Sequence, residues 1–143
     1  MAYNILVVDD SMSMRAIIKK VIAMSGFDVG EIVEAGNGLE ALAKLEDFWA
    51  DVVLSDIHMP EMDGIELLKK IKSDPLMASM PVVMITTESR DEVVSGALAM
   101  GAAGYIKKPF RPEDIKALLV EILGGEEDAT VGEDQSESDD CDF

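Results

Sequence analysis

Polar side chains stand at the ends of four apolar runs in the sequence. Asp9 and Asp10 follow the first run, and Asp56 follows the third. Thr86 ends the fourth run, and Lys108 comes shortly after the fifth. If the runs are strands of a parallel sheet, their carboxyl ends share one edge, and sheets of this kind bind ligands there. We therefore expect three carboxylates, one hydroxyl and one ammonium group to meet in one site.

Three carboxylates held close together repel one another and raise one another's pKa unless a cation offsets their charge. With one lysine beside them, two negative charges remain, and a single Mg²⁺ ion would neutralise these. Mg²⁺ prefers oxygen ligands from one or two carboxylates. Alternatively, Asp9 or Asp10 merely caps the first helix, and this pair alone does not decide between the two interpretations. The four strand ends taken together favour the metal site.

The elements that must position these groups alternate along the chain. Short apolar runs at 5–8, 31–33, 52–54, 82–85 and 105–106 predict five strands. Stripes at helical spacing predict helices around 14–22, 39–45, 65–71 and 115–122, and a weaker, alanine-rich helix is expected at 90–100. The third helix should end near Pro75, and Pro112 suits a first helical turn. Five β/α repeats imply an α/β fold, a doubly wound parallel sheet in a three-layer sandwich.

Length and charge limit the possible functions. The chain of 143 residues fits one domain, and 48% hydrophobic residues can form a core. A net charge of −17 argues against binding nucleic acid or an anionic membrane. Periodicity ends at about residue 123, and residues 126–143 hold nine acidic residues and no lysine or arginine. We expect a folded domain at 1–123 and a disordered acidic tail at 124–143.

A cytoplasmic location is expected. The single cysteine, Cys141, cannot form an internal disulfide, which fits a reducing compartment. No basic region precedes the first apolar run, so a signal peptide is not expected. The longest uncharged stretch, 93–106, has 14 residues, fewer than the roughly 20 that a membrane span needs.

Four sets of motifs follow one another along the chain: Val7-Val8-Asp9-Asp10, Ser55-Asp56-Ile57-His58-Met59-Pro60 with Met62-Asp63-Gly64, Ile85-Thr86-Thr87 and Tyr105-Ile106-Lys107-Lys108-Pro109-Phe110. In this order they resemble the receiver domains of bacterial two-component response regulators. The resemblance covers residues 4–123 and is strongest to stand-alone regulators of the chemotaxis type. It implies a flavodoxin-like strand order of 2-1-3-4-5.

The resemblance also implies a role for each residue of the expected site. Asp56 would be the phosphoacceptor, receiving the phosphoryl group from a phosphohistidine of a sensor histidine kinase. Asp10, Asp56 and the backbone carbonyl of His58 would bind Mg²⁺, and Asp9 would reach the metal through water. Mn²⁺ is expected to substitute for Mg²⁺. Thr86, a residue that could also be an ordinary strand end, would contact the phosphoryl group in the active state.

Further residues of the switch follow from the same resemblance. Lys108 would contact the phosphoryl group through its ammonium; alternatively, it is only a solvated loop charge. Tyr105 would move inward after Thr86; alternatively, it only packs against the sheet. The resemblance implies a cis bond before Pro109. His58 and Glu88 are expected at the rim of the site, where they would tune the lifetime of the phosphorylated state.

The expected function is a phosphoaspartate signalling switch rather than an enzyme. Output would run through protein contact at residues 89–120, in chemotaxis or motility. A phosphorelay intermediate or phosphate sink is the alternative within this class. A magnesium phosphohydrolase is less favoured because His58 stands where a second acid is usual, and a flavin-binding domain is less favoured because the first loop is acidic. The tail would be a solubilising extension or a recognition element that ends in Phe143.

Overall fold

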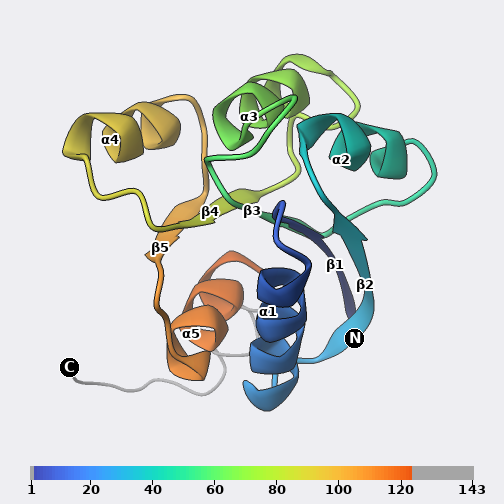
Figure 1. The fold of residues 1–143 in the computed structure, drawn as a ribbon. Coiled ribbons are helices and arrows are strands. Elements are labelled where there is room, and N and C mark those ends of the chain that lie inside the picture. The colour runs from blue at the N-terminus through green and yellow to red at the C-terminus, as the bar shows by residue number, and fades with distance from the viewer. Residues whose placement is uncertain (1, 124–143) are drawn as a thin grey trace.

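The computed structural model describes residues 2–123, which form ten alternating strands and helices (Figure 1). The strands are β1 (Tyr3–Val8), β2 (Val29–Ala35), β3 (Val52–Ser55), β4 (Val82–Thr86) and β5 (Gly104–Lys107). The helices are α1 (Met12–Met24), α2 (Gly38–Leu45), α3 (Gly64–Ser73), α4 (Asp91–Ala99) and α5 (Pro112–Ile122). The predictions about the acidic tail, including Cys141 and Phe143, lie outside the described residues.

All neighbouring strands are parallel, in the order β2-β1-β3-β4-β5. Helices α2, α3 and α4 cover one face of the sheet, and α1 and α5 cover the other (Figure 1). The doubly wound three-layer α/β fold and its strand order are therefore confirmed. Among residues 2–123, no helix is long and apolar enough to cross a bilayer.

The continuous apolar runs exist because both faces of the sheet are covered. Side chains of a strand alternate between the faces. Leu6 and Val8 pack with the cluster under α2 and α3, whereas Ile5 and Val7 pack with the cluster under α1 and α5. Every residue of β3 and β4 is buried for the same reason. The edge strand β2 is longer than predicted, because Gly30 and Glu34 interrupt the apolar pattern on either side of the predicted residues 31–33.

Local signals fix where the helices begin and end. Ser11 caps α1 by accepting a hydrogen bond from the amide of Met14, so the interpretation of Asp9 or Asp10 as the cap is wrong. Asp63 and the first turn of α3 form a capping box. Helix α3 ends at Ser73, just before the predicted break, and Pro112 opens α5 as expected. These caps hold the loops at the carboxyl ends of the strands in place.

Candidate functional site

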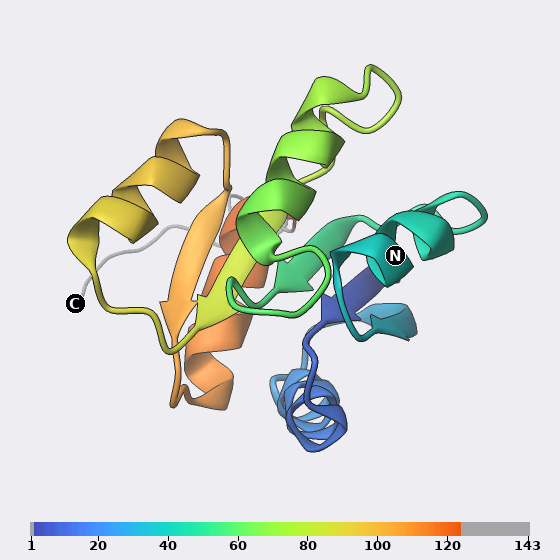
Figure 2. The same cartoon turned by 45° about the horizontal axis from the view of Figure 1, so that its top comes forward.

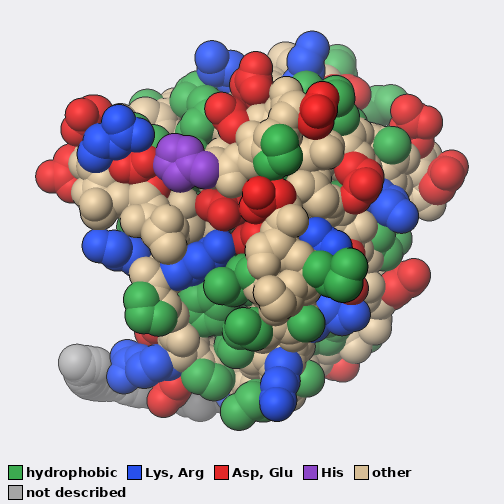
Figure 3. Space-filling model, viewed as in Figure 1, with side chains coloured by type: hydrophobic (Ala, Val, Ile, Leu, Met, Phe, Trp, Pro, Cys, Tyr) green, Lys and Arg blue, Asp and Glu red, His purple; other side chains and the backbone are tan. Residues whose placement is uncertain are grey.

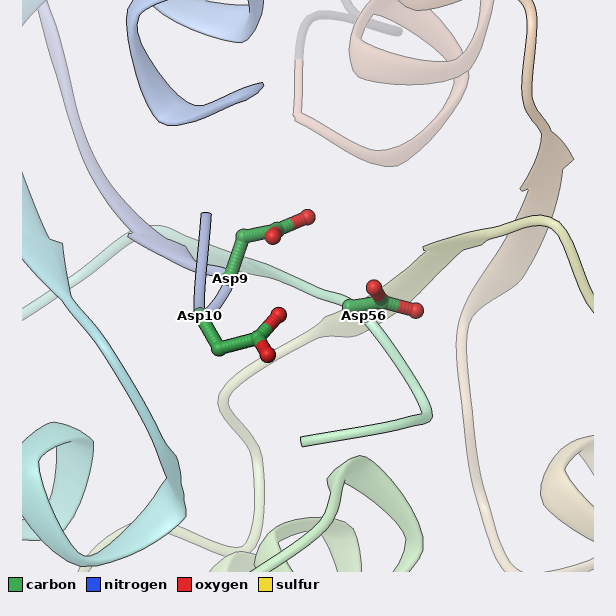
Figure 4. Close-up of side chains that lie close together, drawn as sticks. All are labelled: Asp9, Asp10 and Asp56. Carbon is green, nitrogen blue, oxygen red and sulfur yellow. The ribbon is translucent and has the colours of Figure 1, made fainter. Parts of the chain in front are cut away.

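Three carboxylates meet at the carboxyl edge of the sheet. Oxygen atoms of Asp9, Asp10 and Asp56 lie within 4.8 Å of one another (Figure 4). Backbone hydrogen bonds beyond the strand ends place them: the amide of Asp9 donates to the carbonyl of Ala35 at 3.1 Å, and the amide of Asp56 donates to that of Val8 at 2.9 Å. Figure 3 shows acidic side chains gathered at the centre of this face, with basic side chains close by.

Lys108 bridges two of these acids. Its Nζ lies 2.7 Å from Oδ2 of Asp9 and 3.3 Å from Oδ2 of Asp56. The side chains of Asp9 and Lys108 are only 2% and 9% exposed, so this ion pair is buried. The amide of Lys108 donates to the carbonyl of Thr86 at 2.9 Å, which fixes the start of the loop. The peptide bond between Lys108 and Pro109 is cis, as predicted.

The two oxygens of Asp56 have different surroundings. Oδ1 accepts a hydrogen bond of 2.7 Å from the amide of Ile57, whereas Oδ2 faces the ammonium of Lys108. The loop continues to α3, whose first amide, on Gly64, donates to the carbonyl of Ile57 at 2.8 Å. This loop holds the Asp56 carboxylate at the edge of the sheet and leaves it only half-buried.

The set of donors suits a hard divalent cation. All three side chains offer carboxylate oxygens, the ligands that Mg²⁺ prefers, and Asp10 is exposed, so water can complete the coordination shell. The ammonium of Lys108 offsets one of the three negative charges. The remaining two charges match those of one Mg²⁺ ion, so the residues present fit this metal.

Thr86 and Tyr105 are linked through the backbone of Glu88. Oγ1 of the buried Thr86 accepts a hydrogen bond of 3.2 Å from the amide of Glu88. The hydroxyl of Tyr105 donates to the carbonyl of the same residue. Burial raises the pKa of Tyr105, and the charge of Glu88 adds to this effect, so the hydroxyl stays a donor. The two predicted switch residues therefore both bond to the backbone of the loop that joins β4 to α4.

The side chain of Glu88 is clamped between His58 and Arg90. Its Oε1 lies 2.7 Å from Nε2 of His58, and Arg90 donates through Nε to Oε2 at 2.8 Å and through Nη2 to Oε1 at 3.0 Å. Hydrogen bonds from the side chain and backbone of Arg90, then from His58, hold the pKa of Glu88 far below its ordinary value. The two predicted rim residues thus touch, and they join the loop after β3 to the loop after β4.

Sequence reasoning missed two arginines of this region. Arg90 completes the rim contact described above. Arg15 donates from Nη1 to the backbone carbonyl of Asp9 at 2.6 Å, and its Nε lies 2.9 Å from Oε1 of Glu34 on β2. Lys19 contacts the other oxygen of Glu34 at 2.8 Å. The spacing of Arg15 and Lys19 on one helix face was a usable signal for a shared acidic partner, although it did not identify that partner.

Comparison with known proteins agrees with this geometry. Residues 5–120 match the family model described as the response regulator receiver domain. The chain is 44% identical to the chemotaxis protein CheY1 of Helicobacter pylori over 123 residues, which cover 85% of this chain and 97% of that one. It is 43% identical to a CheY homologue of Campylobacter jejuni over 124 residues, covering 85% and 92% of the two chains.

Solved structures with the same fold include chemotaxis proteins. The structure of Vibrio cholerae CheY4 is 35% identical with a TM-score of 0.77, and the match covers 86% of this chain and all of that one. A CheX–CheY–BeF3–Mg complex from Borrelia burgdorferi is 28% identical with a TM-score of 0.75, covering 85% of this chain and 89% of that one. The second structure contains both a magnesium ion and a partner protein.

Proposed function

The chain belongs to the response regulator receiver family, and from this premise we propose that it is a phosphoaspartate switch of a two-component chemotaxis system. In this proposal a sensor histidine kinase phosphorylates Asp56, and the phosphorylated chain signals by contact with another protein. The observation that carries the proposal is the cluster of Asp9, Asp10 and Asp56 with Lys108 at one edge of the sheet. Receiver domains are signalling proteins rather than classical enzymes.

The phosphoryl transfer needs little from the protein beyond position and charge. A carboxylate oxygen of Asp56 attacks the phosphorus atom, and the bond between phosphorus and the kinase histidine nitrogen breaks. Because a carboxylate is already ionised near pH 7, no general base is needed. The ammonium of Lys108, held beside Oδ2 of Asp56, offsets negative charge on the phosphoryl oxygens. The attachment of the phosphoryl group to Asp56 and its later loss by hydrolysis are part of the same proposal.

The proposed metal site consists of Asp10, Asp56 and the backbone carbonyl of His58, with Asp9 reaching the ion through water. When bound, Mg²⁺ would offset charge on the transferring phosphoryl group. Mn²⁺ would serve in its place because it accepts the same oxygen ligands. The oxygen-rich, partly exposed donor set supports this assignment.

The switch follows from competition for hydrogen bonds. A phosphoryl group adds charge and acceptor oxygens at Asp56. The Thr86 hydroxyl would turn toward these oxygens, and its bond to the amide of Glu88 would break. Tyr105, which donates to the carbonyl of Glu88, would then lose its present partner and move inward. The affected surface is that of α4, β5 and α5, within residues 89–120, and we propose it as the output face.

The rim contact between His58 and Glu88 is proposed to set the lifetime of the phosphorylated state. In this proposal the linked side chains, whose Nε2 and Oε1 atoms lie 2.7 Å apart, restrict how a water molecule approaches the phosphorylated Asp56. His58→Ala and Glu88→Ala should each change the decay rate measured by phosphate release. As a matched control, Glu113→Ala removes an exposed acid from the first turn of α5, outside the contacts of His58, Glu88 and Arg90. Identical decay in all four proteins would contradict the assignment.

Two further properties belong to the proposal. The folded receiver domain is placed at 1–123 and the acidic tail at 124–143, and the protein acts in the cytoplasm, where a kinase can reach it. Transfer from a purified histidine kinase labelled with radioactive phosphate tests the function directly. The wild-type chain should accept the label in the presence of Mg²⁺, and Asp56→Asn should not. Equal labelling of Asp56→Asn would refute the role of this residue.

A further inference from the structure

An apolar groove lies at the opposite end of the sheet from the phosphoryl site. It has a volume of about 330 Å³ and lies between the end of α2, the turn that follows α3, and the loop before β3. The apolar residues that line it are Leu42, Leu45, Trp49, Leu76 and Met77. The loops that follow α2 and α3 extend away from the arrowheads of β4 and β5 in Figure 2.

The walls of the groove are large apolar side chains that face solvent. Trp49, the only tryptophan of the chain, is 52% exposed, and Leu76 is 82% exposed. The floor is different, because Leu42, Leu45 and Met77 are half-buried and pack against the core. Exposed apolar patches that continue into a packed floor are typical of sites where another molecule binds.

The exposure of these walls does not come from loose loops. The turn that presents Leu76 is closed by hydrogen bonds from the amide of Leu76 to Oδ1 of Asp74, at 2.8 Å, and from the amide of Met77 to the carbonyl of Asp74, at 2.9 Å. Lys72 fastens the far side of the turn by donating to the carbonyls of Ala78 and Met80, both at 3.0 Å.

Trp49 is held in a similar way by its neighbours in the chain. Ala50 is fully buried, and Phe48 packs against the same core cluster. Both walls are therefore preorganised, which lowers the entropic cost of binding a partner.

The negative charge around the groove indicates which kind of molecule can bind there. Its polar lining consists of Glu46 and Asp74, two acids, and no basic side chain is among the described residues that line it. A second copy of the chain would bring the same acids, and residues 126–143 hold nine acids without a base. Like charges would therefore oppose both of these occupants.

We propose that this groove binds a cationic amphipathic helix of a partner protein, with the apolar face of that helix between Trp49 and Leu76. Lysine or arginine residues beside the apolar face would then lie near Glu46 and Asp74. Helices bind in apolar grooves in this way through anchors spaced three or four residues apart. Trp49 precedes β3 and Leu76 precedes β4, whereas Asp56 and Thr86 lie at or beyond the carboxyl ends of these strands. We therefore expect the groove to stay open when Asp56 is phosphorylated and to act as a docking site that does not depend on the proposed switch.

The test uses the fluorescence of Trp49 in the full chain. The probe is a synthetic 18-residue peptide without tryptophan, with leucine on one helical face and lysine on the other. It should shift the Trp49 emission to shorter wavelength and saturate. One control peptide has the same composition in scrambled order, and another has glutamate in place of lysine. Neither control should cause a saturable shift.

Variants then locate the binding site. Leu76→Ser should weaken binding of the lysine peptide about tenfold, as loss of an anchoring side chain does. Glu46→Lys, at an exposed acid of the groove lining, should weaken it as well, and added salt should reduce this charge-dependent part. Leu39→Ser is the matched control, because Leu39 is also an exposed leucine, 52% accessible on α2, but does not line the groove. It should bind like the wild type.

Three results would overturn the proposal. The first is equal affinity of the lysine peptide for Leu76→Ser and for the wild type. The second is binding of the scrambled peptide as tight as that of the lysine peptide. The third is a shift of Trp49 emission when residues 126–143 are deleted, which would mean that the tail occupies the groove. Labelling of Asp56 by acetyl phosphate should be the same in Leu76→Ser and the wild type. Failure of the docking proposal is thereby distinguished from failure of the phosphorylation proposal.

Discussion

Replacing Gly64 with alanine should damage the phosphoryl site through the backbone alone. Gly64 is the first residue of α3, and a Cβ atom there would lie 2.1 Å from the carbonyl oxygen of Asp56 and 2.9 Å from Cα of Ile57. Since contacts of a Cβ below 3.0 Å are essentially never observed, the backbone after Asp56 must move by at least 0.9 Å, the difference between 3.0 and 2.1 Å. The neighbouring atoms are backbone and cannot turn away as a flexible side chain would.

The size of the effect follows from this displacement. Forcing one extra carbon into a packed region costs about 1–3 kcal/mol in the free energy of unfolding. A shift of about 1 Å at a reacting group can lower a rate about 100-fold. Gly64→Ala should therefore lose both stability and the ability to take up a phosphoryl group, and the loss of rate should exceed what the unfolded fraction explains.

Gly96→Ala is the matched control. Gly96 lies within α4, and a Cβ there meets no atom within 4 Å. Alanine is favoured over glycine inside a helix by up to about 1 kcal/mol, so this variant should be as stable as the wild type or more so. Urea unfolding, followed by the fluorescence of Trp49, measures stability, and mass spectrometry measures the rate at which acetyl phosphate labels Asp56. Wild-type stability and labelling in Gly64→Ala would refute the reasoning.

Three more predictions follow from the contacts of the site and of α1. Lys108→Ala breaks a buried ion pair and should lower the free energy of unfolding by roughly 3 kcal/mol in the absence of Mg²⁺. Urea unfolding curves should show a smaller loss of stability when Mg²⁺ is present, because the metal offsets the negative charge that Lys108 otherwise offsets. Thr86→Ala should leave labelling of the phosphoacceptor largely intact but remove the gain in partner affinity on phosphorylation, measured by isothermal titration; an unaltered gain would contradict the coupling. Hydrogen bonds from Lys19 and then Arg15 lower the pKa of Glu34 below its ordinary value of 4.5. A lowered folded pKa means that this stabilisation is complete above about pH 4.5 and is lost as the pH falls through the folded value. Glu34→Gln should therefore lose less stability than the wild type between pH 6 and pH 3 in urea titrations.

The sequence predicted the sheet well where the strands are covered on both faces. In strands such as Val82–Thr86 every residue is buried, so that the sequence forms a continuous apolar run with turn residues on either side. The edge strand β2 was predicted too short, because Gly30 and Glu34 do not fit an apolar run although an edge strand tolerates them. The end of α3 was predictable from Pro75 because the constraint of proline is local.

Some residues of the site could be predicted from the sequence, and others could not. Asp9, Asp56 and Lys108 could be predicted because each stands at or near the carboxyl end of a strand, and topology alone brings those ends together. The contact of His58 with Glu88 spans 30 residues and depends on how closely two loops approach. Arg90 gave no usable signal, since its partner lies two residues away in a loop without a regular period. Side-chain contacts between irregular loops are set by three-dimensional packing, which periodicity does not encode.

In the proposed switch, Asp56 takes up a phosphoryl group with the help of a metal held by the neighbouring acids. The most direct test is peptide mapping by mass spectrometry after incubation with acetyl phosphate, with Mg²⁺ and with a chelator. One added phosphoryl group, located on Asp56, should appear in the presence of Mg²⁺, and almost none should appear with the chelator or in Asp10→Asn. Labelling at another residue, or labelling of Asp56 at the same rate without a divalent cation, would contradict this mechanism.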